Sequence, residues 1–152
     1  MKILKTMRRE IRFRGMSIKS GEWLVGDYIR NRGLHFIAPP GIADPQKTWE
    51  DFEIFPDTLG QFTGLKDKEG RDIYDGDVVK WDDMSGGKDW RFAVVRIDPD
   101  IIFDCSPVKA VCGVTNSTDY VFHYGRLLYQ QTYNFLTVIG NIHDKDTDIT
   151  YR

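Results

Sequence analysis

The stretch FTGLKDKEGRDIYDGDVV, residues 62–79, decides the fold that we expect for this chain. Three glycines punctuate it, Gly64, Gly70 and Gly76, and glycine can adopt backbone angles that other residues resist. Asp75 and Asp77 flank the last of them, and aspartates at such positions bond to their own backbone in tight turns. The stretch therefore predicts tight turns between short strands. Tyr74 and its apolar neighbours are expected to fasten these turns to a core.

Downstream of this stretch, short apolar runs continue to alternate with turn residues. The strands that we expect here are 78–81, 90–97, 101–105, 110–114, 119–124 and 135–142. Helical periodicity is sparse, and residues 125–133 could form one helical turn. Many short strands at this spacing are typical of a small barrel or sandwich.

Upstream, the pattern is also that of strands. Residues 11–14 alternate apolar and basic side chains, and residues 22–25 return after a turn that ends at Gly21, so that 11–29 reads as a β-hairpin. Residues 34–37 form a third expected strand, prolines at 39, 40 and 45 indicate a loop, and 48–55 is ambiguous. Residues 1–8 resemble a loose leader, and either Met1 or Met7 could be the functional start.

Length and composition are those of a small globular protein. The chain has 152 residues, of which 41% are hydrophobic and 13% aromatic, a share of aromatics that favours β-structure. We expect one compact unit organised in three parts: the leader at 1–8, a hairpin region with its loop at 9–60, and a β-barrel at 61–152. The expected fold class is mainly β, with little helix.

Residues 62–79 resemble the hallmark of the YopX family of phage and prophage proteins, whose pattern reads aromatic-T-G-L-K-D-K-x-G-x-x-I-Y-x-G-D-[IV]-V. Residues 9–15 with Gly21-Glu22-Trp23 resemble the start of the family, and 138–142 resemble its end. The resemblance implies an SH3-like β-barrel in the second half, preceded by an added N-terminal hairpin. It also implies a gene carried by a phage or mobile element and a capacity to self-associate. The family supplies no catalytic residue to carry over.

Charge is distributed unevenly along the chain. Residues 1–33 hold nine basic and three acidic side chains, whereas the remainder holds twelve basic and twenty acidic ones. Arg9, Arg12 and Arg14 are the candidate contacts to a partner or to nucleic-acid phosphates. The basic end could equally meet the acidic region of another copy or be a solvated edge that discourages aggregation. Association through these charges predicts an oligomer that is sensitive to salt.

Motifs for chemistry are lacking in the sequence. It contains no Walker A loop, no nucleophile elbow and no local metal-binding motif, so we expect no cofactor and no metal site. The segment 144–148 copies the start of a calcium loop but lacks its later ligands, and is interpreted as a solvated tail. If the chain were a metal-dependent nuclease, Asp75 and Asp77 would be the acidic pair to test. Cys105 and Cys112 are expected to be buried and reduced.

The expected location is the cytoplasm, because the sequence shows neither a signal peptide nor a run of 18 apolar residues. Asn116-Ser117-Thr118 fits a glycosylation sequon but is interpreted as a turn. The function that we expect is that of a non-enzymatic binding or self-assembly module, with a homo-oligomer and a phage or host protein as its partners. The alternatives are a nucleic-acid-binding modulator that acts through the N-terminal hairpin, and a metal-assisted hydrolase whose site assembles from distant loops.

Overall fold

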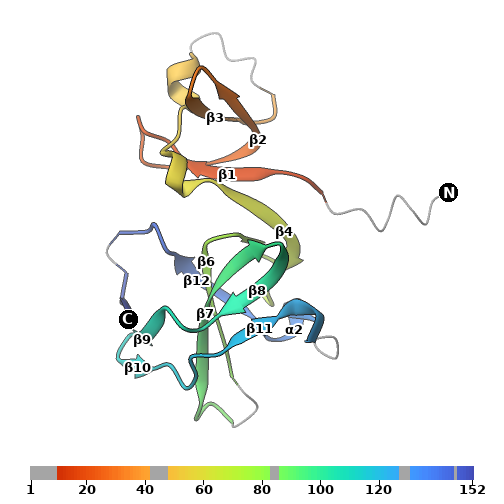
Figure 1. Ribbon diagram of the computed structural model, residues 1–152, viewed down its shortest axis with the longest axis vertical. Helices are drawn as coiled ribbons and strands as arrows, with labels where there is room; N and C mark the ends of the chain where they lie inside the picture. Colours follow the sequence, from red (N-terminus) through yellow and green to blue (C-terminus); the bar gives the residue numbers. More distant parts are fainter. Residues whose placement is uncertain (1–9, 42–47, 83–85, 127–130, 146) are drawn as a thin grey trace, which may run out of the picture. The chain divides into compact units, whose positions relative to one another are not determined.

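The computed structural model describes residues 10–41, 48–82, 86–126, 131–145 and 147–152, and divides the chain into two compact units. The first unit comprises residues 1–64 and the second residues 65–152. Their net charges are opposite in sign, since the first holds ten basic and eight acidic side chains and the second eleven and fifteen. Figure 1 shows the strands of each unit.

The first unit is built on a sheet with the strand order β3-β2-β1-β4-β5, in which β5 (Asp72–Tyr74) belongs to the second unit. Its strands are β1 (Phe13–Met16), β2 (Trp23–Asn31), β3 (Leu34–Ala38) and β4 (Gly60–Lys66), the last of which continues into the second unit. Two short 3-10 helices, η1 (Trp49–Phe52) and η2 (Pro56–Thr58), precede β4. The buried hydroxyl of Thr58 accepts the backbone N–H of Met16 at 2.9 Å, which ties η2 to β1.

The second unit holds two further antiparallel groups of strands. One sheet has the order β11-β8-β7-β6-β12, and a smaller one has the order β10-β9-β13. The strands are β5 (Asp72–Tyr74), β6 (Asp77–Asp82), β7 (Trp90–Asp98), β8 (Asp100–Asp104), β9 (Val108–Val111), β10 (Val114–Thr115), β11 (Val121–His123), β12 (Thr137–Asn141) and β13 (Ile149–Tyr151). A 3-10 turn η3 (Tyr124–Arg126) and one helical turn α2 (Thr132–Phe135) precede β12.

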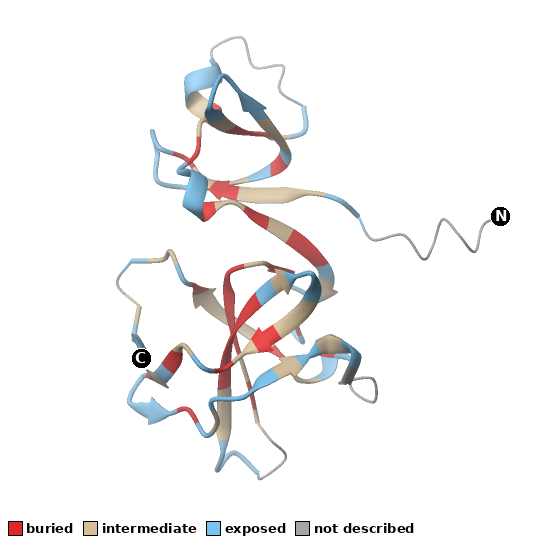
Figure 2. Cartoon of the chain, in the orientation of Figure 1, coloured by how far each residue is buried: buried red, intermediate tan, exposed pale blue. Residues whose placement is uncertain are grey.

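The central strands β6 and β7 are buried on both faces, as the red segments of Figure 2 show. Successive side chains of a strand point to opposite sides, so adjacent residues enter different cores. On β7, Ala93 and Val95 pack with Trp81 in one cluster, whereas Phe92 and Val94 pack in a second. This explains why β7 has an almost continuous apolar run instead of a simple alternation.

A buried asparagine joins three segments of the second unit. The Oδ1 atom of Asn116 accepts the backbone N–H of Phe92 at 3.0 Å. Its Nδ2 atom donates to the carbonyl oxygens of Phe92, Cys105 and Val108 at 2.8, 3.2 and 3.0 Å. Because Asn116 is only 5% exposed, the sequon has a structural role within this unit.

The mainly β prediction is confirmed, and most predicted strands appear near their expected positions. The single strand predicted over 110–114 is wrong, because Cys112 and Gly113 adopt positive φ angles that form a turn between β9 and β10. The terminal strand β13 was not anticipated; it pairs with β9. The ambiguous segment 48–55 contains η1.

The described strands form open sheets without a closed barrel, so the SH3-like assignment is not confirmed. Cys105 is buried and reduced as predicted, and burial raises the pKa of its thiol to about 12. Cys112 is reduced but exposed, because it lies in the turn between β9 and β10; its predicted burial is wrong. Among the described residues, no helix is long and apolar enough to cross a membrane.

Replacement of Asn116 by alanine is expected to lower the free energy of unfolding by about 3 kcal/mol, because it leaves several buried backbone groups without partners. The neighbouring side chain of Ser117 is exposed, so Ser117→Ala serves as a matched control with little expected effect. Urea denaturation measures both. Equal unfolding midpoints for the two variants would contradict the role assigned to Asn116.

Candidate functional site

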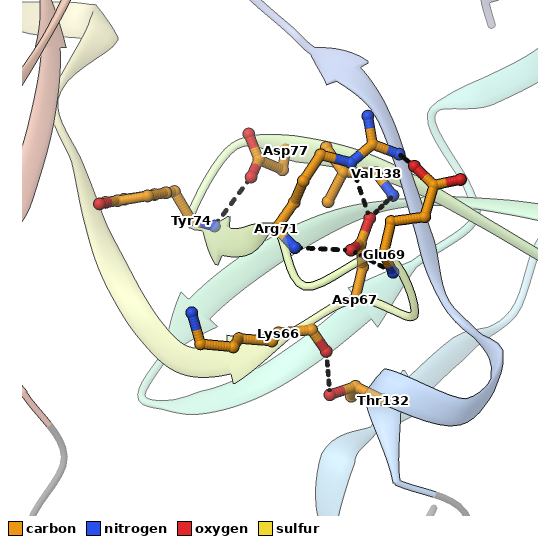
Figure 3. Close-up of polar contacts among 8 residues, drawn as sticks. All are labelled: Lys66, Asp67, Glu69, Arg71, Tyr74, Asp77, Thr132 and Val138. Carbon is orange, nitrogen blue, oxygen red and sulfur yellow. Dashed lines mark hydrogen bonds and ion pairs between the residues drawn. The ribbon is translucent and has the colours of Figure 1, made fainter.

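The turn that follows β4 is organised around the buried carboxylate of Asp67, shown in Figure 3. Its Oδ1 atom accepts the backbone N–H groups of Glu69 and Arg71 at 2.9 and 2.8 Å. Its Oδ2 atom accepts the N–H of Val138 on β12 at 3.0 Å and the Nε–H of Arg71 at 3.1 Å. One carboxylate thus closes its own turn and fastens that turn to a strand 71 residues away.

Asp67 remains ionised despite its burial. Burial by itself would raise the pKa of this carboxyl, but the N–H donors of Val138, Arg71 and Glu69, together with the Arg71 charge, lower the pKa more. The net effect is a pKa below the usual value for aspartate. The negative charge is therefore part of the folded structure.

Two further hydrogen bonds join the same turn to the segment around β12. The hydroxyl of Thr132 on α2 donates to the carbonyl oxygen of Lys66 at 2.7 Å (Figure 3). The backbone N–H of Lys68 donates to the carbonyl oxygen of Leu136 at 2.9 Å. The turn and the α2–β12 segment are thus held together by both backbone and side-chain bonds.

The second turn of the motif is organised by Asp77. Its Oδ2 atom accepts the backbone N–H of Tyr74 at 2.8 Å, and its Oδ1 atom accepts the Nδ2–H of Asn141 at 3.1 Å. Gly76 lies between Asp75 and Asp77 and has a φ of 91°. A Cβ atom added to this glycine would lie only 3.3 Å from the Nδ2 atom of Asn141. A larger residue at position 76 would therefore strain the backbone and crowd Asn141.

Of the residues predicted as a structural motif, Gly70, Asp75 and Gly76 lie in turns, whereas Gly64 lies within β4, Tyr74 ends β5 and Asp77 begins β6. Gly64 and Gly70 adopt φ angles of 84° and 81°, a backbone conformation that glycine tolerates better than other residues. Asp75 is half-buried, and burial raises the pKa of its carboxyl. The oxygens of Asp77 bond to Tyr74 and Asn141, so the Asp75 and Asp77 pair is arranged as part of a turn.

Of the candidate binding arginines, Arg14 lies on β1 and Arg12 directly precedes this strand, whereas Arg9 falls outside the described residues. Both Arg12 and Arg14 are half-buried. The Arg12 guanidinium lies 4.0 Å from the ring centroid of Phe62, and that of Arg14 lies 4.4 Å from the ring of Trp23. These cation–π contacts give both side chains a role in packing. Their binding to phosphate or to a partner stays a prediction.

The histidines and acidic residues do not gather into a metal centre in the described part of the chain, where no group of three potential ligands occurs. His35 hydrogen-bonds to the hydroxyl of Tyr28 at 2.6 Å and stacks on its ring. His123 lies 3.7 Å from Asp100 on the surface. In the predicted calcium-like segment, Asp144 accepts the backbone N–H of Asn141, whereas Asp146 lies outside the described residues.

A groove of about 500 Å³ in the second unit was not predicted. Its apolar lining comes from β7, β9, β12 and β13 and includes Trp90, Phe92 and Ile139. Lys80 on β6 and Asp148 beside β13 provide opposite charges at its walls. No sequence signal could locate this groove, because its lining residues are spread over 70 positions and come from two sheets.

Replacement of Asp67 by asparagine is expected to destabilise the protein by about 3 kcal/mol at neutral pH, because the amide supplies donors where the fold needs an acceptor. The lowered pKa means that the carboxylate stabilises the fold above the pKa of the unfolded chain. This contribution disappears as the pH falls through the lower pKa of the folded state. Urea denaturation should therefore show a large difference between wild type and Asp67→Asn at neutral pH and a smaller one in acid.

The exposed Glu69 in the same turn gives the control, Glu69→Gln, which removes a surface ion pair with Arg71 and should have an effect below about 1 kcal/mol. A difference between wild type and Asp67→Asn that does not depend on pH would argue against an ionised Asp67.

Comparison with known proteins identifies the family of the chain. A family model described as YopX protein matches residues 12–147, which is nearly the whole chain and includes the motif at 62–79. No curated protein matches the chain. The chain therefore belongs to the YopX family.

Proposed function

We propose that this YopX-family chain is a phage-associated accessory protein that acts as a non-enzymatic self-assembly module. The observation that carries the proposal is the outer edge of β11, one of the two terminal strands of the sheet β11-β8-β7-β6-β12, with which no described strand pairs. Tyr120 and Val121 at this edge are 68% and 47% exposed. Terminal strands with exposed apolar side chains are sites where another chain can add a strand.

The hydrogen bonds between β11 and β8 determine which backbone groups of β11 point away from β8. The carbonyl oxygen of Tyr120 accepts the N–H of Cys105 at 2.9 Å, and Phe122 pairs with Phe103. Backbone groups alternate in direction along an antiparallel strand. The N–H and C=O groups of Val121 and His123 therefore point away from β8, toward the open edge.

A second copy is the natural partner for such an edge. In an antiparallel pair centred on Phe122, Val121 of one copy lies opposite His123 of the other, and the same pair repeats on the other side of the twofold axis. This arrangement is self-complementary, as a twofold interface requires. The ring centroids of Phe122 and Trp81 lie 5.8 Å apart, and the Arg91 guanidinium lies over the Phe122 ring. These contacts hold β11 against the rest of the second unit. The opposite net charges of the two units also favour association between copies.

Sedimentation velocity tests the proposal with the variant Val121→Pro. Proline removes an N–H that makes no bond to β8, so it should disrupt assembly and leave the sheet intact. The control Val121→Thr keeps the N–H and the β-branched shape. We expect wild type and Val121→Thr to self-associate, and Val121→Pro to do so at least roughly tenfold more weakly. A wild-type chain that stays monomeric, or a Val121→Pro variant that assembles normally, would refute the proposal.

A further inference from the structure

The groove of the second unit has the features of a binding site that is separate from the β11 edge. Its volume of about 500 Å³ lies in the range of protein ligand sites. Its floor continues the second core cluster, in which Phe92 and Val111 are buried and Trp90, Ile139 and Ile149 are half-buried. The aromatic and aliphatic surface is thus held in place by the core beneath it.

Lys80 supplies a positive charge on one side of this floor. It faces Phe92 across the β6–β7 pair, and its ammonium nitrogen lies 5.2 Å from the ring centroid of Trp90. Among the described residues, no carboxylate lies within ion-pair distance of this ammonium. A ligand carboxylate could therefore pair with Lys80 without displacing an internal partner.

Asp148 supplies a negative charge to the same lining. Its backbone oxygen accepts the N–H of Cys112 at 2.9 Å, and its Oδ2 atom accepts the thiol of the same residue at 3.7 Å. In the described part of the chain, no basic side chain pairs with it. The two charges come from different parts of the lining, since Lys80 lies on β6 and Asp148 directly precedes β13, and the other lining residues are mostly apolar.

Terminal strands also border the groove. β10, β12 and β13 each end a sheet and each contributes to the lining. An extended peptide can use both the apolar floor and the backbone of such strands. Charge complementarity then specifies its side chains: an acidic residue for Lys80, a basic residue for Asp148, and apolar residues between them.

We propose that this groove binds an extended peptide segment of another protein, with an acidic and a basic residue on either side of an apolar centre. The test uses the full chain as bait for a display library of random peptides. The most enriched peptide is then synthesised with a fluorescein label and its affinity is measured by fluorescence anisotropy. We expect enriched peptides to share the acidic–apolar–basic order.

Charge-reversal variants decide whether the groove is the site. Lys80→Glu should weaken binding roughly tenfold or more, and a peptide with its acidic residue replaced by lysine should recover affinity for this variant. The exposed Lys109 on β9 does not line the groove, so Lys109→Glu is the matched control, with an expected change below about twofold. Asp148→Lys tests the second charge of the lining independently and does not depend on whether Lys80→Glu folds.

The proposal would be overturned by a lack of enrichment above background, or by enriched peptides that bind both charge-reversed variants as tightly as wild type. A loss of self-association in Lys80→Glu, without peptide binding to wild type, would assign the groove to a second copy and would also overturn it. The result of the peptide-binding test does not depend on the result for Val121→Pro, because that variant changes the edge of β11 and not the groove.

Discussion

The buried carboxylate of Asp67 is the interaction on which the turn region of the second unit depends. It accepts four N–H donors, of which three belong to the backbone of its own turn or of β12. An ionised carboxyl at zero exposure is costly unless every lone pair is used. Here the donors are supplied by the turn that the carboxylate itself closes, so the turn and the charge stabilise each other.

The polar side chains of the second unit act mainly as connectors between segments. Asp77 joins the start of β6 to β12 through Asn141, and Asn116 joins β7 to the segments before and after Pro107. The two apolar clusters on either side of β6 and β7 need such connectors, because short strands bury little surface individually. Within residues 62–79, Asp67 and Asp77 therefore both connect turns of this chain to β12. The open edge of β11 and the groove beside Trp90, where binding is proposed, lie outside residues 62–79.

Local chemistry made much of this fold predictable. Gly70 and Gly76 were identified as turn residues because of their spacing and neighbours, and both adopt positive φ. The role of Asp67 could not be predicted in the same way, because its partner Val138 is 71 residues away and nothing local marks the contact. The strand β13 was missed because three residues after an acidic segment carry no periodic signal. The groove charges, Lys80 and Asp148, look like ordinary surface residues until the fold brings both into the lining of one groove.

Hydrogen exchange of the Val138 amide tests the central role of Asp67 most directly. Val138 lies on β12, a terminal strand, and its N–H bonds to the Asp67 carboxylate. Nuclear magnetic resonance near neutral pH can follow this amide separately from that of Val79, its neighbour in the central strand β6. If Asp67 fastens the turn to β12, the Val138 amide should exchange about as slowly as the amides of the core strands. Exchange as fast as that of the exposed residues of β13 would show that the carboxylate does not hold this strand, and would contradict the account.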